Sequence, residues 1–143
     1  WTPEPPHHRI LNKHSDKVLA VDGMSTANDA RVVQFDNAGT GDHAWQLLPA
    51  PGGALRLRNG QSGKYLAVRD SSTADSALAV QYEDTGRPDL LWTREDQGDG
   101  WFLLRNAHSG KVLGVHEMAT GNSAQVVQYT DNGTEDHLWR LTD

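Results

Sequence analysis

The chain has 143 residues, enough for one domain with a real core, and it has no cysteine, which excludes both a disulfide scaffold and a thiolate metal site. Its formal charge is −6, from 13 basic and 19 acidic residues spread along the sequence. Such a surface repels a phosphate backbone, so nucleic acid is not an expected partner, and no apolar run approaches the roughly 20 residues that a membrane span needs.

Residues 1–8 are predicted to be a leader that precedes the first structural unit. The stretch WTPEPP has no initiating Met, no basic start and no apolar segment of the kind that a signal peptide needs. We therefore expect a processed or excised piece of a longer protein, joined to an upstream module by a stiff Pro-rich tether. His7, His8 and His14 could gather a metal ion, but histidines in a tether are more often solvated, and neither a metal nor another cofactor is predicted.

The rest of the chain repeats one unit three times without a gap. The repeats cover residues 9–49, 55–94 and 101–143, and turn-forming breaks at 50–53 and 97–100 separate them. The markers of each unit recur at an interval of 47 residues, as in Gln34, Gln81 and Gln128 and in Trp45, Trp92 and Trp139. The repeat therefore accounts for a single domain that spans residues 9–143.

Each unit has short apolar clusters of strand length. The runs at 18–21, 65–68 and 112–115 predict a strand, and the β-branched run at 32–35 and its copies predict a second. The segments that end at the three Trp residues predict a third, and Ile10, Leu57 and Leu104 mark a fourth before each Asn turn. About twelve strands are expected and no helix, so the fold class is all-β.

Three near-equal, uncapped units favour closure about a three-fold axis. A propeller needs at least four blades, and a solenoid usually has altered terminal repeats. A β-trefoil satisfies the pattern, since each unit gives half its strands to a shared barrel and half to a hairpin cap. Closure also removes the sheet edges that invite aggregation.

The pattern S-G-K-x-L-x-V, followed by A-x-x-V-Q-aromatic, an N-G-type loop and a Trp, resembles the ricin B-type β-trefoil lectin domains. It is most similar to carbohydrate-binding modules of the family 13 type, which are appended to secreted bacterial glycoside hydrolases. Three elements of the family pattern are replaced: the loop-bridging cysteines, the Gln of the Gln-x-Trp signature, and the sugar-binding Asp before the Val of the first strand. The replacements are Val18, Tyr65 and Val112 for the cysteines, His43, Leu90 and His137 for the Gln, and Ala20, Ala67 and Gly114 for the Asp.

A sugar presents an apolar C–H face and a rim of hydroxyls, which proteins read with a flat aromatic ring and a few polar side chains. Each repeat has these residue types close together: an aromatic, an Asp three residues before the Trp, a His beside it in two repeats, and polar loop residues. Asp70, Asp84 and Asp131 are further loop acids of this kind. The predicted sugar-binding residues are Asp22, Phe35, Asp36, Asn37, Asp42, His43, Tyr82, Asp89, His116, Glu117, Tyr129, Asn132, Asp136 and His137.

Several of these residue types also have structural explanations. The Trp residues are expected to be core, and the Gln residues are expected to be amides that hold turns. The aromatic residues could pack in the barrel as readily as they could stack on a sugar. The aspartates could cap a turn. The histidines could brace the loop, and a brace made by histidine would be sensitive to acid. Repeat two has Leu90 in place of His and carries Arg87-Pro88 in its loop, so it is predicted to be degenerate, and repeats one and three are the predicted sites.

The resemblance implies a non-catalytic carbohydrate-binding module that tethers a linked glycoside hydrolase to a glycan through up to three weak sites. Galactose- or arabinose-containing glycans are the expected ligands, and a monomer is expected. The alternative is a protein-interaction or inhibitor-type β-trefoil that has lost sugar binding. A stand-alone enzyme is disfavoured, because a catalytic site normally breaks internal symmetry and the polar residues here obey it.

Overall fold

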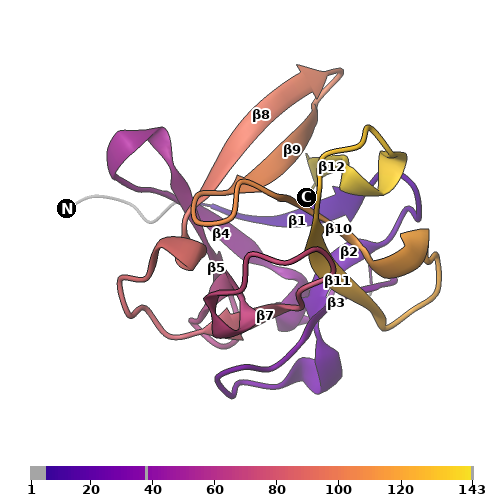
Figure 1. Ribbon diagram of the computed structural model, residues 1–143. Helices are drawn as coiled ribbons and strands as arrows, with labels where there is room; N and C mark the ends of the chain where they lie inside the picture. The colour runs from indigo at the N-terminus through magenta and orange to yellow at the C-terminus, as the bar shows by residue number, and fades with distance from the viewer. Residues whose placement is uncertain (1–5, 38, 143) are drawn as a thin grey trace.

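The computed structural model describes residues 6–37 and 39–142, so residues 1–5 of the predicted tether lie outside the described residues. Within this part of the chain there are twelve strands and seven short 3₁₀ turns (Figure 1). The strands are β1 (His7–Asn12), β2 (Val18–Val21), β3 (Val32–Phe35), β4 (Trp45–Pro49), β5 (Leu55–Asn59), β6 (Tyr65–Val68), β7 (Ala79–Tyr82), β8 (Trp92–Gly98), β9 (Trp101–Asn106), β10 (Val112–Val115), β11 (Ala124–Tyr129) and β12 (Trp139–Thr142). The 3₁₀ turns are η1 (Asp22–Met24), η2 (Gly41–His43), η3 (Pro51–Gly53), η4 (Arg69–Ser71), η5 (Pro88–Leu90), η6 (His116–Met118) and η7 (Glu135–His137).

The first and last strands of each repeat close into one antiparallel barrel. Strand β1 pairs with β4 and β12, β5 pairs with β4 and β8, and β9 pairs with β8 and β12. The two inner strands of each repeat form a hairpin, as in β2–β3, β6–β7 and β10–β11. Backbone pairing joins these hairpins to one another: β11 pairs with β3, and isolated bridges join Arg31 to Val80 and Leu78 to Val127. The predicted β-trefoil is confirmed.

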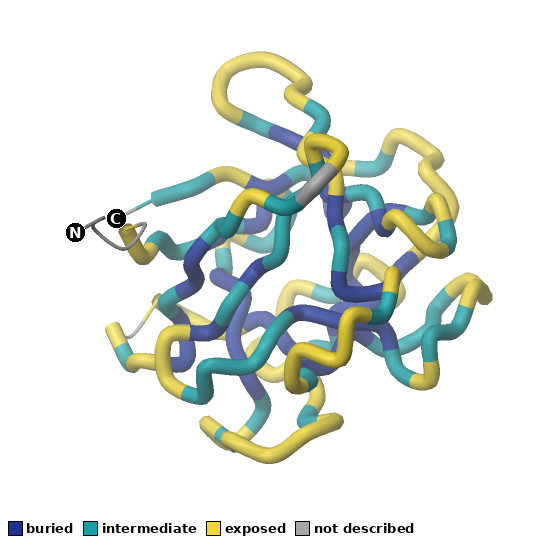
Figure 2. Tube along the Cα trace, turned by 90° about the vertical axis from the view of Figure 1, so that its left-hand side faces the viewer, coloured by how far each residue is buried: buried dark blue, intermediate teal, exposed yellow. Residues whose placement is uncertain are grey.

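The three repeated Trp residues form the centre of the core. Trp45, Trp92 and Trp139 are fully buried, and each indole N–H donates to a backbone carbonyl of the hairpin in its own repeat, at 3.0, 3.1 and 2.9 Å. Burying a Trp without such an acceptor would leave its N–H unsatisfied. Figure 2 shows the buried segments running through the interior and most of the exposed segments in loops, although strand β8 is also largely exposed. The predicted packing role of these residues is confirmed.

The repeated Gln residues connect each repeat to its neighbour. The amide of Gln34 donates to the carbonyls of Ala119 and Gly121 in repeat three, at 2.9 and 3.0 Å, and its oxygen accepts from the Ser15 hydroxyl. Gln81 makes the equivalent amide bonds to carbonyls of repeat one, and Gln128 makes them to carbonyls of repeat two. The oxygen of each also accepts from a serine hydroxyl of its own repeat. Because all three are buried and saturated, their predicted structural role is confirmed.

Three predicted boundaries are wrong in detail. The third strand begins at each Trp and does not end there, because the residues before it turn back on themselves, with the His43 N–H donating to the Thr40 carbonyl at 3.0 Å. Strand β1 begins at His7, so His7 and His8 pair with β4 and are not part of a tether. Strand β8 continues through Gly98 as a long hairpin with β9, which extends beyond the barrel in Figure 1.

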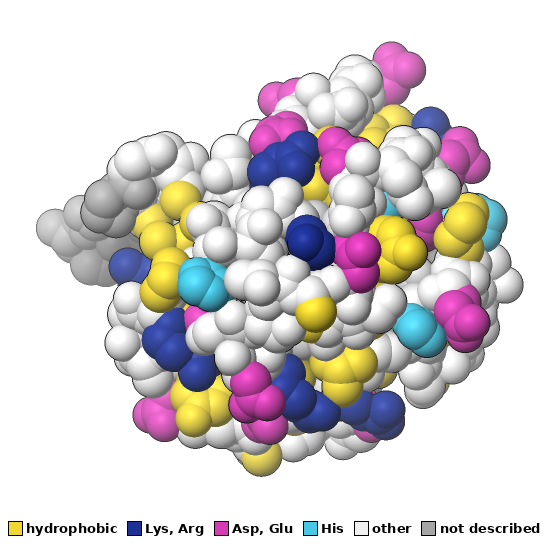
Figure 3. Space-filling view, viewed as in Figure 1, with side chains coloured by type: hydrophobic (Ala, Val, Ile, Leu, Met, Phe, Trp, Pro, Cys, Tyr) yellow, Lys and Arg dark blue, Asp and Glu magenta, His cyan; other side chains and the backbone are white. Residues whose placement is uncertain are grey.

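The surface is polar and mixed in charge. Acidic and basic side chains are interspersed on the face shown in Figure 3. In the part of the chain that the structure describes, no helix is long and apolar enough to span a membrane. Over the same residues, no group of three His, Asp or Glu side chains is arranged to hold a metal ion.

Candidate functional site

Two pockets lie at equivalent places in repeats one and three. Each is bounded by the hairpin of its own repeat and by the 3₁₀ turn before the Trp. Their volumes are about 180 Å³ in repeat one and about 460 Å³ in repeat three. The corresponding region of repeat two is filled, as described below.

The floor of the first pocket carries the carboxylate of Asp42, which is only 3% exposed. Its Oδ2 atom accepts the backbone N–H of Val21 at 3.3 Å, and its Oδ1 atom accepts the Thr40 hydroxyl at 2.6 Å. Turn η2 places Asp42 here, because it reverses the chain immediately before Trp45 enters the barrel. The carboxylate therefore bonds a strand far back in the sequence and lines the pocket at the same time. It does not cap its own turn.

His43 lies beside this carboxylate and is also buried. Its Nε2 atom is 3.7 Å from Asp42 Oδ2, and its Nδ1 atom has no hydrogen-bond partner among the described residues. Burial lowers the pKa of the imidazole below its ordinary value of 6.5, against the opposing charge of Asp42, and the Arg9 guanidinium lowers the pKa further. The neutral form of the imidazole is therefore favoured, and its Nδ1 atom is buried without a partner among the described residues.

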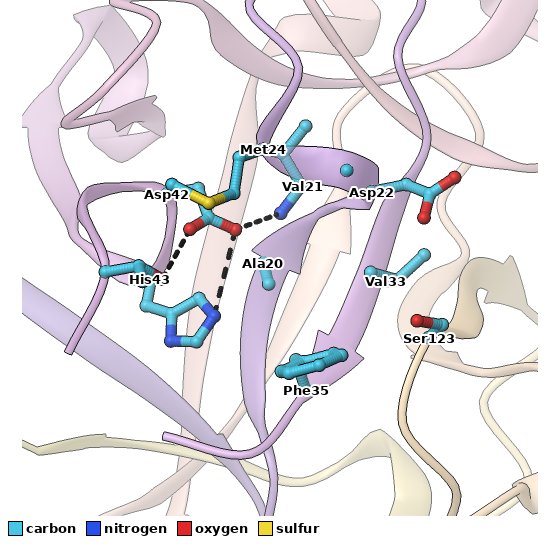
Figure 4. Close-up of a pocket in the computed structure, with 11 residues that line it drawn as sticks. Ala20, Val21, Asp22, Met24, Val33, Phe35, Asp42, His43 and Ser123 are labelled. Carbon is cyan, nitrogen blue, oxygen red and sulfur yellow. Dashed lines mark hydrogen bonds and ion pairs between the residues drawn. The ribbon is translucent and has the colours of Figure 1, made fainter. Parts of the chain in front are cut away.

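The opposite wall of the first pocket is apolar. Phe35, at the end of β3, is 36% exposed, and Met24 in turn η1 is also exposed. Figure 4 shows Asp42 and His43 on one side of Ala20, and Phe35 on the other. Ser123 completes the wall from repeat three, where its backbone N–H donates to the Gln34 carbonyl at 2.8 Å. The pocket is thus shared between neighbouring repeats.

Repeat three has the same arrangement with more polar walls. The Asp136 carboxylate accepts the Val115 N–H at 3.2 Å and the Thr134 hydroxyl at 2.6 Å, and the Tyr129 ring is 38% exposed. His137 Nε2 is 3.6 Å from Asp136 Oδ2, and its Nδ1 is likewise without a partner among the described residues. The other predicted site residues that line this pocket are His116, Glu117 and Asn132.

In repeat three the His137 ring occupies the space that a side chain at position 114 would need. A Cβ built at Gly114 would overlap the ring atom Cδ2 of His137 and would lie 3.0 Å from Asp136 Oδ2. A side chain at this position would therefore displace the His ring. The Asp136 carboxylate, which turn η7 supplies, lies next to the place where the family pattern has its Asp.

In repeat two the same region is closed by side chains of the chain itself. Leu90, in place of His, packs with Ala67 and Val80, and Tyr82 packs against this cluster. The guanidinium of Arg87 lies 4.5 Å from the centre of that ring. Tyr82 and Asp89 are therefore brought together as predicted, but the ring face and the carboxylate are covered. The prediction that repeat two is degenerate agrees with this geometry.

Several predicted residues lie outside both pockets. Asp36 is exposed, exchanges hydrogen bonds with Asn122 and lies 3.5 Å from Lys17; the Asn122 bond is the main reason its pKa is lowered. Asn37 beside it is exposed and does not line the first pocket. The further loop acids Asp84 and Asp131 are held in ion pairs with arginines, at 2.9 and 3.1 Å. Asp22 does line the first pocket, but Arg31 pairs with it at 2.8 Å.

Some residues at the pockets were not predicted from the sequence. Thr40 and Thr134 donate to the buried carboxylates, and Met24 and Met118 form part of the rims. The 47-residue period marks both pairs. Thr recurs in repeats one and three where repeat two has Arg87, and Met recurs in repeats one and three where repeat two has Ser71. Ser76 and Ser123 also recur at this interval, with Asp29 at the equivalent place in repeat one, but the period does not show that each lines the pocket of a neighbouring repeat.

The arrangement is suited to binding a small polar ligand with an apolar face. Each open pocket has one exposed aromatic ring, one buried carboxylate and one buried imidazole, and these groups are fixed by strands and 3₁₀ turns. The carboxylate retains lone pairs beyond the two hydrogen bonds it accepts within the chain. Such a pocket can hold a ligand by stacking and hydrogen bonding.

Comparison with known families gives a match over the whole chain. The sequence model described as "Ricin-type beta-trefoil lectin domain-like" matches residues 1–82, 42–129 and 88–143. The three matches overlap and follow the internal repeat. No curated protein matches the sequence at a significant level.

Comparison with solved structures gives close matches to β-trefoils. The designed three-fold symmetric protein ThreeFoil is 36% identical, with a TM-score of 0.94 over 96% of this chain and 98% of that chain. An exo-β-1,3-galactanase from Clostridium thermocellum is 31% identical, with a TM-score of 0.96 over 99% of this chain but only 31% of the galactanase. A ricin B-like lectin from Macrolepiota procera, solved in complex with lactose, is 17% identical, with a TM-score of 0.82 over 99% of this chain and 97% of that chain, and shows the fold alone.

Proposed function

The chain belongs to the ricin-type β-trefoil lectin domain-like family, and we propose that it is a carbohydrate-binding module with sugar sites in the pockets of repeats one and three. The observation that carries the proposal is the recurrence, in two pockets, of an exposed aromatic ring opposite a buried Asp–His pair. The module is proposed to have no catalytic activity of its own.

The chemistry of the two pockets fits a pyranose or furanose ring. The C–H face of the sugar would stack on Phe35 or Tyr129, because both residues line a pocket and are partly exposed. Sugar hydroxyls would donate to Asp42 or Asp136, which are held in place by backbone and threonine donors. Both parts of the site are pre-organised, so little conformational entropy is lost on binding.

We propose galactose- or arabinose-containing glycans as the natural targets, and a linked glycoside hydrolase as the partner in the same polypeptide. The galactanase relative supports this, because this chain matches 31% of that enzyme's length at 31% identity. Polysaccharide targets would place the protein outside the cell, so we propose that it is secreted. It would act as a monomer, since the barrel strands are all paired within the chain.

Two weak sites on one rigid body would act together on a polymer. Shallow pockets that read one or two sugars bind on the order of mM to tens of μM. Binding of the second pocket to the same polysaccharide is intramolecular, and avidity can raise retention by about a hundredfold or more where the geometry allows both contacts.

Isothermal calorimetry against galactose, arabinose, lactose and β-1,3-linked galactan fragments tests the proposal. The expected result is binding of a monosaccharide with a stoichiometry of two per chain and tighter apparent binding of the polymer. Absence of binding to these and to a broad glycan array would refute it. A crystal soaked in the best ligand would assign the density to repeats one and three.

A further inference from the structure

In repeat two, a cationic side chain of the repeat itself fills the region that is an open pocket in the other two repeats. The guanidinium of Arg87 lies over the Tyr82 ring, 4.5 Å from its centre. Its Nε atom is 3.1 Å from Asp89 Oδ1, and its Nη2 donates to Asp89 Oδ2 at 3.3 Å. Asp89 is completely buried. The aromatic face and the buried carboxylate therefore hold a positively charged group between them.

The same ring and carboxylate are present in repeats one and three without the cation. Three-fold equivalence relates Tyr82 to Phe35 and Tyr129, and Asp89 to Asp42 and Asp136; Arg87 is replaced by Thr40 and Thr134. Of the described residues that line the two open pockets, none is Lys or Arg. Repeats one and three therefore lack the internal cation, and in both of them the aromatic ring and the carboxylate line a cavity.

The remaining partners of the two buried carboxylates are neutral donors. Each accepts one backbone N–H and one threonine hydroxyl, and the neighbouring imidazole nitrogen is 3.7 Å away in repeat one and 3.6 Å away in repeat three. A buried carboxylate gains most from a charged hydrogen-bond donor, and a cation also gains from the face of an aromatic ring once it is desolvated. The repeat-three pocket adds the exposed carboxylate of Glu117 at its wall.

From this equivalence we infer that the two open pockets prefer a cationic group, and that the preferred sugar carries a free amino group. The inference rests on the proposed carbohydrate function, and it makes amino sugars, such as those of de-N-acetylated glycans, the preferred ligands in place of neutral galactose or arabinose residues. The ammonium would occupy the place that the Arg87 guanidinium has in repeat two, between ring and carboxylate. An N-acetylated sugar would lose the charge and would bring a bulkier group against the same carboxylate.

Calorimetry at pH 7 with matched monosaccharides tests the inference. Galactosamine and glucosamine are compared with galactose, glucose and the two N-acetylated sugars. We expect the amino sugars to bind about tenfold or more tightly than the neutral parents, at two sites per chain. Equal or weaker binding of the amino sugars overturns the inference.

Single substitutions assign the preference to the two carboxylates. Asp42→Asn and Asp136→Asn keep the size of the side chain and an acceptor oxygen, and each should remove the amino-sugar preference of one site. Asp96→Asn is the matched control, because Asp96 is exposed on strand β8 far along the chain from either pocket and pairs only with Arg94 among the described ion pairs. A preference that survives in the double Asn variant contradicts the inference.

Opening the pocket of repeat two provides a gain of function that misfolding cannot imitate. The double variant Arg87→Thr with Leu90→His gives repeat two the threonine and the histidine of the other repeats, and it removes both the internal cation and the leucine that fills this region. We expect a third amino-sugar site, counted by stoichiometry, and an unchanged stoichiometry overturns the inference.

The outcomes separate this inference from the proposed function. If neutral sugars bind both pockets and amino sugars bind no better, the amino-sugar assignment fails and the carbohydrate-binding function stands. If free arginine binds and no sugar does, both fail, and the pockets are sites for a protein side chain.

Discussion

The Oδ2 atom of Asp42 accepts the backbone N–H of Val21 at 3.3 Å, so a pocket carboxylate is also the hydrogen-bond partner of the strand that forms the pocket wall. Asp89 and Asp136 bond Val68 and Val115 in the same way, at 3.2 Å each. The aspartate before each Trp therefore belongs to the trefoil in all three repeats and to an open pocket in only two. Mutations at these positions should affect stability and binding to different extents.

Replacing Asp42 or Asp136 by Ala should each remove one sugar site, and the double variant should not bind. Each change also leaves a buried N–H unpaired, with an expected cost of about 1–3 kcal/mol in the free energy of unfolding. Calorimetric stoichiometry and urea unfolding measure the two effects. Asp96→Ala, at an exposed position, is the control for both. Two remaining sites in the double variant would show that the carboxylates are structural alone.

Removing the aromatic wall should weaken binding with little effect on the fold. Phe35 and Tyr129 are 36% and 38% exposed, so replacement by Ala removes less packing than it would at a fully buried position. Loss of the stacking surface should weaken sugar binding about fivefold or more at the affected site. Titration of Phe35→Ala and Tyr129→Ala, with thermal unfolding in parallel, gives the comparison. A large fall in melting temperature with unchanged affinity would identify the rings as packing residues.

Removing a core Trp should, in contrast, mainly lower the stability of the fold. Trp45 is fully buried and its indole donates to the Leu19 carbonyl at 3.0 Å. Trp45→Ala should lower the free energy of unfolding by about 3–5 kcal/mol, because it creates a cavity and leaves that carbonyl without its donor. Denaturant unfolding measures this cost. If Trp45→Phe, which fills most of the volume, were as destabilising as Trp45→Ala, the cavity would not be the dominant cause.

Acid should destabilise the protein through His43. Its pKa is lowered in the folded state, mainly by burial, so the unfolded chain takes up the proton at a higher pH than the folded chain does. The stability contribution is complete above about pH 6.5, the ordinary value, and is lost as the pH falls through the lower folded-state pKa. The glutamine of the family pattern cannot be protonated there, so His43→Gln should flatten the dependence between pH 8 and pH 5.

Urea unfolding at a series of pH values checks this difference between the parent and His43→Gln. The lowered pKa values of Asp36 and Glu95 affect stability in a separate range, because these carboxylates lose their contribution only as the pH falls below ordinary values of 3.8 and 4.5. Parallel curves for the two proteins above pH 5 would exclude His43 as the titrating group.

The sequence by itself determined the fold class, the three-fold topology and most of the core. A 47-residue period with short β-branched runs leaves few closed arrangements, and Trp and Gln at fixed places in each repeat mark the positions that every copy must bury and saturate. The same period identified the aromatic, Asp and His of each candidate site. It also marked repeat two as different, through Arg87 and Leu90.

Only the tertiary structure decided which of these residues share a cavity. Asp36 and Asp42 are both loop acids in one repeat, but the direction of turn η2 buries Asp42 in the pocket, while Asp36 meets Asn122 of another repeat at the surface. Ser123 lines the first pocket for the same reason, since neighbouring hairpins pair across the cap. Contacts between repeats depend on how three units pack around an axis, and periodicity within one unit carries no information about them.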